Sequence, residues 1–273
     1  MDTETGKSLS KAGLSFSPLA MAMLVWLLPA VATAETAQTK PAPVAKAAAA
    51  VPEPYLGKPA KGDTYRIVIL GDSLGDGLYQ GLTRINKGND RVKLTKKSKV
   101  NTGFVRVDRY DWNKAATKIA KSRAYDVAVI LIGLNDLQSF REKGKSHHFQ
   151  TDGWVVRYKD RIDRMMLDLK NAGMAVYWTS IPITSPKRYQ KHYNYLNGLY
   201  REAAEKNGVR FIDTWTPLAD AKGKYTPFWT DEAGKRRNIR MRDGVHFTPT
   251  GYLIFAQFVD DVIKEDMGKV ATQ

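Results

Sequence analysis

Short apolar runs alternate along the chain with stretches whose apolar residues recur every three or four positions. Runs of this kind, rich in β-branched residues and ended by glycine or proline, are typical of strands buried on both faces of a parallel sheet. The second run alternates apolar and basic residues instead, as an edge strand protected by charge does. Strands are predicted over residues 65–70, 92–100, 125–132, 175–181 and 209–212.

The stretches between these strands are predicted to be helices. The last one has Thr248 as its N-cap and Pro249 at its first helical position. Strands that alternate with helices pair in parallel, with right-handed crossovers and helices on both faces. We therefore predict an α/β fold, a three-layer α/β/α sandwich with a mostly parallel five-stranded sheet in a flavodoxin-like order. The predicted helices run from just after residue 73 to residue 85, and over residues 112–122, 155–171, 189–206 and 249–266.

The first strand stops abruptly at Gly71-Asp72-Ser73. A serine at this point lies at the carboxyl end of a strand and near the amino end of a helix, at the sheet edge where α/β proteins bind ligands. From this stretch alone two interpretations stay open. Ser73 either caps the helix or acts as a nucleophile.

Three other segments carry groups that suit a nucleophilic serine. The second and third strands end at Gly103 and at Gly133-x-Asn135, and Asp243-Gly244-Val245-His246 precedes the last helix. A serine hydroxyl becomes a good nucleophile when an imidazole accepts its proton and a carboxylate fixes the tautomer of that imidazole. Backbone N–H groups and a side-chain amide can bind the oxyanion that then forms. These residue types together favour acyl transfer.

Four blocks, Gly71-Asp72-Ser73-Leu74, Gly103, Gly133-Leu134-Asn135-Asp136 and Asp243-Gly244-Val245-His246, resemble in their order those of the SGNH (GDSL-type) hydrolase superfamily. The resemblance implies the SGNH hydrolase fold and a serine hydrolase that needs no metal and no organic cofactor. It implies Ser73 as nucleophile, His246 as general base and Asp243 as the orienting carboxylate. It also implies an oxyanion hole made by the Ser73 N–H, Gly103 and Asn135. The chain looks like an exported bacterial branch without an assigned substrate.

The amino-terminal residues have the layout of a secretory signal. Lys7 and Lys11 precede an uncharged apolar run over residues 19–31, and a small-x-small site ends at Ala34. Because this run is short for a membrane span, we predict a signal peptide over residues 1–34, cleaved after Ala34, and export to the periplasm. An uncleaved membrane anchor is the alternative. Residues 35–62 are rich in Ala, Pro and Lys and are predicted to be a linker, which leaves residues 63–273 as one domain.

Composition narrows the class of partner. The chain has no cysteine, which excludes a disulfide framework, cysteine catalysis and zinc–thiolate sites. Its formal net charge of +15 favours acidic partners, and for an exported chain these are anionic glycans or lipid surfaces rather than nucleic acid. A basic segment precedes Asp243. We interpret this segment as a cationic rim for an anionic polymer, made of Lys235, Arg236, Arg237, Arg240 and Arg242. Trp215, Phe228 and Trp229 would offer surfaces for stacking a sugar. A solvated charged hairpin is the alternative.

The predicted function is that of an exported serine esterase. It removes O-acyl groups, in particular O-acetyl groups, from an envelope carbohydrate through an acyl-enzyme on Ser73. Three alternatives stay open: an O-acetyltransferase that uses the same three residues with an envelope acyltransferase as partner, a non-catalytic periplasmic glycan-binding or assembly factor, and a lysophospholipase or lipase.

Overall fold

The computed structural model describes residues 54–271. The chain divides into two units, residues 1–45 and 46–273, and all described residues belong to the second. The predicted signal peptide and most of the predicted linker lie outside the described residues. No helix within residues 54–271 is long and apolar enough to cross a membrane.

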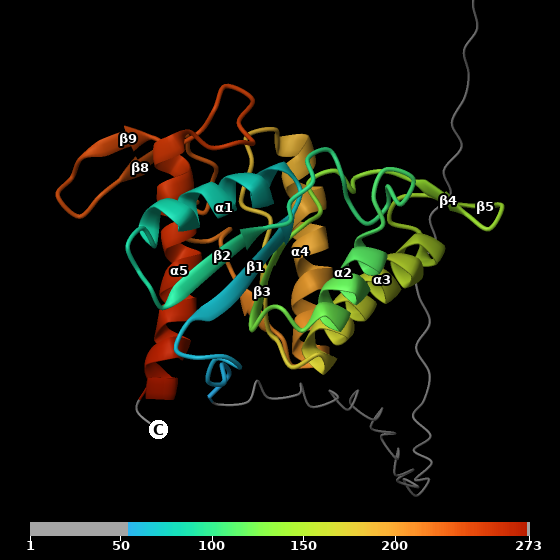
Figure 1. The fold of residues 1–273 in the computed structure, drawn as a ribbon. Helices are drawn as coiled ribbons and strands as arrows, with labels where there is room; N and C mark the ends of the chain where they lie inside the picture. Colours follow the sequence, from blue (N-terminus) through green and yellow to red (C-terminus); the bar gives the residue numbers. More distant parts are fainter. Residues whose placement is uncertain (1–53, 272–273) are drawn as a thin grey trace, which may run out of the picture. The chain divides into compact units, whose positions relative to one another are not determined.

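Five strands form one sheet in the order β2-β1-β3-β6-β7 (Figure 1). Every neighbouring pair is parallel, which confirms the predicted parallel sheet and its flavodoxin-like order. The strands are β1 (Tyr65–Gly71), β2 (Val92–Lys96), β3 (Val127–Leu131), β6 (Ala175–Thr179) and β7 (Arg210–Ile212).

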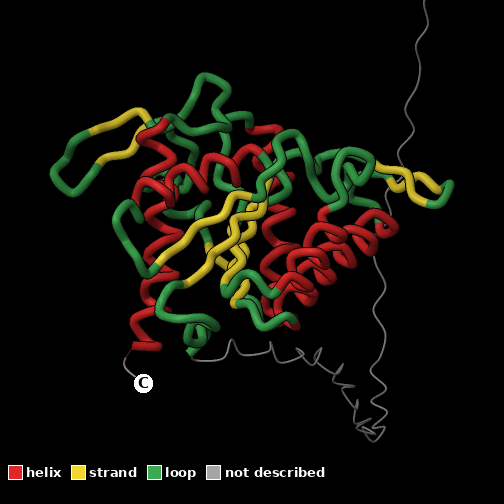
Figure 2. The backbone as a smooth tube through the Cα atoms, in the orientation of Figure 1, coloured by secondary structure: helices red, strands yellow, loops and turns green. Residues whose placement is uncertain are grey.

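Helices cover both faces of this sheet, as Figures 1 and 2 show. α1 (Ser73–Ile85) and α5 (Pro249–Ala271) pack together on one face. The other face carries α2 (Trp112–Ser122), α3 (Asp152–Asn171) and α4 (Lys187–Asn207). Because both faces are covered, all five residues of β3 are buried, and this is why its sequence is continuously apolar. The three-layer prediction is confirmed.

Two small hairpins lie in segments whose sequence gave no strand signal. β4 (Phe140–Glu142) pairs with β5 (Lys145–His147), and β8 (Phe228–Thr230) pairs with β9 (Arg236–Asn238). A strand of three residues is too short to show the two-residue alternation of apolar and polar positions. The register of each hairpin is instead set by its turn, and in the β4–β5 turn Gly144 has a positive φ. The predicted second strand is also shorter than expected, since β2 ends at Lys96.

A segment assigned to the linker is in fact part of the folded domain. Leu56 is buried in the core, with 1% of its surface exposed. The Tyr55 hydroxyl accepts hydrogen bonds from the Val176 and Arg210 N–H groups, each at 3.1 Å, and donates to the Val176 carbonyl. The predicted domain start at residue 63 is therefore wrong, because Tyr55 binds the amino-terminal ends of β6 and β7 and Leu56 lies in the core.

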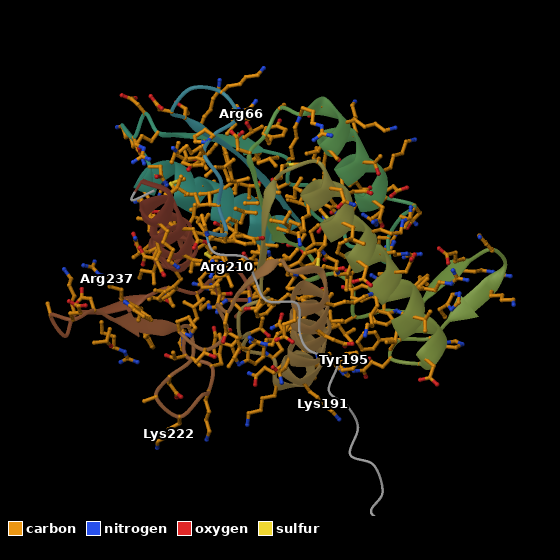
Figure 3. All side chains as sticks on the ribbon, turned by 90° about the horizontal axis from the view of Figure 1, so that it is seen from below. Arg66, Lys191, Tyr195, Arg210, Lys222 and Arg237 are labelled. Carbon is orange, nitrogen blue, oxygen red and sulfur yellow. The ribbon has the colours of Figure 1, made fainter. Side chains whose placement is uncertain are left out.

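Tyr55→Phe tests this attachment. The change leaves two backbone N–H groups and one carbonyl without their partner, so we expect the free energy of unfolding in urea to fall by about 1–3 kcal/mol. Tyr195→Phe is the matched control. Tyr195 lies on α4 (Figure 3) and is half-buried, and its hydroxyl forms no hydrogen bond within residues 54–271. Equal stability of both variants would contradict the assignment.

Candidate active site

The site lies where the strand order changes direction. The chain passes from β1 outward to β2 and then returns to β3 on the other side of β1, so the loops after β1 and β3 leave a crevice between them. Gly71 and Leu131 are register partners at this edge. A Cβ on Gly71 would lie 2.5 Å from the Leu131 carbonyl oxygen, so only glycine lets the two strand ends approach this closely.

Asp72, not Ser73, caps the helix that follows β1. Its Oδ1 accepts a hydrogen bond from the Leu74 N–H at 3.0 Å. Its Oδ2 accepts from the N–H groups of Gly133 and Leu134, at 3.1 Å and 2.9 Å. The buried carboxylate thus joins the loops after β1 and β3. Ser73 is the first residue of α1, and its hydroxyl is not used as a cap.

Ser73, His246 and Asp243 form one continuous hydrogen-bonded chain. Ser73 Oγ lies 2.8 Å from His246 Nε2, and His246 Nδ1 lies 2.7 Å from Asp243 Oδ2. Because a carboxylate only accepts hydrogen bonds, the proton of the neutral imidazole resides on Nδ1 and Nε2 is free to accept the serine proton. The sequence prediction grouped these three residues, and the structure brings them together from α1 and from the loop before α5.

Asp243 is also bonded within its own turn. Its Oδ1 accepts from the N–H groups of Val245 and His246, at 2.8 Å and 2.9 Å. Partial burial acts to raise the pKa of Asp243, but the hydrogen bonds from the His246 ring and from these backbone groups outweigh it and hold the pKa below its ordinary value. The carboxylate therefore stays ionised beside the imidazole.

Two backbone N–H groups of the predicted oxyanion hole have no hydrogen-bond partner among the described residues. Within residues 54–271, neither the Ser73 N–H nor the Gly103 N–H forms a hydrogen bond. The Asn135 amide donates to the Thr102 carbonyl at 2.9 Å, so it is bonded to the same peptide unit that carries the Gly103 N–H. The structure thus links Asn135 and Gly103, and these donors suit an oxyanion.

Asp136 holds the turn that contains Gly103. Its carboxylate accepts hydrogen bonds from the N–H groups of Phe104 and Val105, at 3.0 Å and 3.1 Å, and from the Tyr158 hydroxyl at 2.8 Å. A Cβ on Gly103 would lie 2.0 Å from Asp136 Oδ1, so the turn requires glycine here. Burial raises the pKa of Asp136, although these hydrogen bonds oppose the rise.

A buried arginine from α3 holds the same turn from the other side. Arg161 donates to the Phe104 carbonyl at 2.6 Å and to Glu142 of the β4–β5 hairpin at 2.9 Å. Its guanidinium lies over the Phe140 ring, 4.3 Å from the centroid. Sequence reasoning missed this residue, because nothing in the pattern of α3 distinguishes a buried arginine from an exposed one.

Arg240 does not belong to a cationic rim, and that prediction is wrong. Only 2% of its surface is exposed. Its guanidinium donates to the carbonyls of Val245 and Ile183, at 2.8 Å and 2.7 Å, and lies over the Phe247 ring at 3.6 Å. Burial lowers the pKa of Arg240 to about 10. Arg240 therefore clamps the loop of His246 to the segment that follows β6.

Arg242 of the predicted rim directly precedes Asp243, whereas Arg236, Arg237 and Trp229 lie on the β8–β9 hairpin, which projects beside α5 (Figures 1 and 3). Arg236 covers the Phe228 ring, and Arg237 pairs with Asp231 at 3.6 Å. The Trp229 ring packs against Phe258 of α5, with centroids 5.5 Å apart, so it is not a free stacking surface. The structure places none of these hairpin residues in contact with Ser73, Asp243 or His246, which favours the solvated hairpin. Within residues 54–271, no group of three or more His, Cys, Asp or Glu residues could hold a metal ion.

Solved structures with the same fold include hydrolases of the SGNH class. A GDSL-like lipase from Bacteroides thetaiotaomicron aligns with a TM-score of 0.54 and 18% identity over 77% of this chain and 92% of its own. An acetyl xylan esterase aligns with a TM-score of 0.53 and 18% identity over 72% and 99%. The esterase EstA from Pseudoalteromonas sp. aligns with a TM-score of 0.52 and 15% identity over 75% of this chain and 99% of its own. These likenesses show that the chain has the SGNH hydrolase fold.

The sequence itself belongs to a family that has a description but no assigned activity. Residues 66–262 match the family described as "protein of unknown function (DUF459)", and the chain is a member of it. Among curated protein sequences, none matches the chain.

Arg240→Lys tests the clamp behind His246. A lysine cannot bridge two carbonyls while stacking on Phe247, so we expect His246 to lose its alignment with Ser73. The rate at which a fluorophosphonate labels Ser73 should fall by about tenfold or more, while circular dichroism shows a folded protein. Arg66→Lys, which alters a remote arginine paired with Asp126 at the start of β1, should label like the wild type. Equal labelling of both variants would refute the clamp.

The pH dependence of stability tests the buried Asp72. Burial raises its pKa from the ordinary 3.8 to about 7, against the pull of its three backbone hydrogen bonds. Between these values the unfolded chain has lost a proton that the folded chain keeps. Stability should therefore fall as pH rises from about 4 to about 7, by at most about 1.4 kcal/mol per pH unit from this group. Asp72→Asn, which cannot ionise, should show a shallower fall in urea unfolding; an unchanged slope would exclude Asp72 as the source.

Proposed function

We propose that this protein is a serine hydrolase that cleaves carboxylic esters through an acyl-enzyme on Ser73. The observation that carries the proposal is the chain of hydrogen bonds from Ser73 Oγ through the His246 ring to Asp243, at 2.8 Å and 2.7 Å. Such a chain activates a serine hydroxyl, and fold alone would not require it.

Acylation follows from this geometry. Ser73 Oγ attacks the ester carbonyl carbon while its proton passes to His246 Nε2, and the resulting imidazolium is stabilised by ionised Asp243. The carbonyl oxygen becomes an oxyanion, which accepts hydrogen bonds from the Ser73 and Gly103 N–H groups and the Asn135 amide. The C–O bond to the alcohol then breaks, and His246 returns the proton to the leaving alkoxide oxygen.

Deacylation repeats the same steps with water. His246 accepts a proton from a water molecule, the hydroxide oxygen attacks the acyl carbon, and the same donors hold the second oxyanion. The bond to Ser73 Oγ breaks, the serine recovers its proton from His246, and the free acid leaves. A sugar hydroxyl in place of water would make the reaction an acyl transfer.

We further infer that the substrate is an O-acylated carbohydrate, with acetyl as the acyl group. The support is twofold. One of the similar structures is an acetyl xylan esterase. The side chains of His246 and Asp243 are 36% and 50% exposed, so the catalytic chain is open to a bulky polymer. The proposed location, the periplasm, rests on the sequence of residues 1–34 and makes an envelope carbohydrate the substrate.

Ser73→Ala tests the catalytic proposal. Removing the attacking oxygen should reduce hydrolysis of p-nitrophenyl acetate to the background rate, a loss of about a thousandfold or more. Asn135→Ala, which removes one oxyanion donor, should lower kcat by about a hundredfold. Ser122→Ala, at the far end of α2, is the matched control and should keep wild-type activity.

The same assay distinguishes the alternatives. Hydrolysis that survives Ser73→Ala, or a wild type that hydrolyses no ester, would overturn the proposal and leave a glycan-binding or assembly factor. Acetate release that falls when an unacylated glycan is added, with acetyl groups appearing on that glycan, would identify an O-acetyltransferase.

A further inference from the structure

Cations without acidic partners lie on three segments near the catalytic chain, namely the loop after β2, the start of α4 and the loop before α5. Lys99, Lys187, Arg188 and Arg242 are exposed, and none of the four forms an ion pair within residues 54–271. We call these residues the cationic ring. Two neighbouring bases are neutralised, since Arg106 pairs with Asp108 and Lys96 pairs with Asp76.

Lys99 lies beside the start of α1. Its backbone N–H donates to the Gly71 carbonyl at 2.7 Å, two residues before Ser73. Asp76 of α1 already accepts hydrogen bonds from Lys96 and Ser98, at 2.8 Å and 2.7 Å. The Lys99 ammonium lies over the Tyr110 ring, 5.9 Å from its centroid, and has no acidic partner within residues 54–271.

Arg242 and the start of α4 lie on the side of His246. Arg242 precedes Asp243, whose carboxylate is fully used by His246 and by its own turn. The Ser185 N–H donates to the Gly244 carbonyl at 2.8 Å, which holds the start of α4 against this loop. Lys187 and Arg188 follow directly, so three of the four cations border the loop that carries the general base.

The charges on α4 oppose the local stability of that helix. Its first turn contains Lys187 and Arg188, no acidic residue, and no side-chain cap. Cations at a helix amino terminus are unfavourable because the helix dipole is positive there, whereas α1 and α3 follow the rule with Asp76 and Asp152. Arg188 contacts a neutral partner, since its guanidinium donates to the Tyr189 hydroxyl at 2.9 Å and lies over the Tyr189 ring, 4.6 Å from the centroid. Neither Lys187 nor Arg188 has an acidic partner within residues 54–271, and function is a usual reason for such a departure from a local rule.

We propose that the ester is carried on a polyanion, namely an acidic polysaccharide whose carboxylates contact the cationic ring on either side of the reacting sugar. This inference rests on the proposed function and names its substrate class. A single small anion would engage one loop, whereas a chain with repeated negative charges engages Lys99 on one side of Ser73 and Arg242, Lys187 and Arg188 on the other. The β8–β9 hairpin, which the sequence pointed to, is not required.

The test removes four charges at the ring and four elsewhere. The ring variant combines Lys99→Gln, Lys187→Gln, Arg188→Gln and Arg242→Gln. The matched control carries Gln in place of Lys58, Lys61, Lys87 and Arg91, which are exposed bases near the amino edge of the sheet. Substrates are O-acetylated polygalacturonate, neutral O-acetylated glucomannan, and p-nitrophenyl acetate. Binding of Ser73→Ala forms to polygalacturonate is measured by calorimetry.

For the wild type and the control, kcat/KM on the acetylated polyuronate should exceed that on glucomannan and fall as salt rises from about 20 mM to about 300 mM. The ring variant should lose about tenfold or more on the polyuronate, lose the salt dependence, and keep its activity on glucomannan and p-nitrophenyl acetate. Ring-dependent binding of polygalacturonate by the Ser73→Ala forms would support the polyanion even if the hydrolase proposal failed.

Three results would overturn the inference. The ring variant could hydrolyse the polyuronate as fast as the wild type, or the control variant could lose as much activity as the ring variant. The third is ring-dependent binding to phosphatidylglycerol vesicles without any preference for polyuronate, which would mean that the ring contacts a membrane surface. A wild type inactive on p-nitrophenyl acetate would instead count against the proposed function.

Discussion

The site depends on one buried carboxylate that accepts backbone hydrogen bonds from two loops. Asp72 ties the Leu74 N–H at the start of α1 to the Gly133 and Leu134 N–H groups after β3. These loops are distant in sequence, and the pairing of β1 with β3 brings their first residues together. Because Asp72 accepts for both, the turn that carries Ser73 and the loop that carries Asn135 form a single rigid unit. Burying a carboxylate costs free energy unless it is hydrogen-bonded, so loss of any of these backbone donors would destabilise the folded site.

Other buried charged groups repeat this device on the remaining parts of the site. Asp136 accepts from the successive N–H groups of Phe104 and Val105, and Arg161 donates to the Phe104 carbonyl. Arg240 donates to the Val245 carbonyl beside His246. In each case a side chain holds main-chain atoms one or two residues away from a proposed catalytic group. The loops are thus held by other side chains than the proposed catalytic ones, as a preorganised site requires.

The fold follows largely from local sequence pattern. The helices α1 to α5 and all five sheet strands were predicted with their type and order, because the spacing of apolar residues in long segments indicates a helix or a buried strand. The four blocks also indicated Ser73, Asn135, Asp243 and His246, since each follows a strand end or precedes a capped helix. The predictions were wrong where a strand was too short to show a pattern, or where the same composition occurs in both linkers and folded segments. The two hairpins are only three residues deep, and residues 54–62 have a linker-like composition although Leu56 and Tyr55 anchor them.

The sequence by itself determined the layered architecture, the parallel sheet and the residue types that could perform acyl transfer. Only the tertiary structure decided which polar residue does what. It made Asp72 the helix cap instead of Ser73, buried Arg240 behind His246, and left Lys99 and Arg242 without an acidic partner among residues 54–271. The physical reason is that hydrophobic periodicity reports which face of an element is buried, whereas the role of a charged side chain depends on its partners. For Arg240 that partner is the Ile183 carbonyl, 57 residues away along the chain.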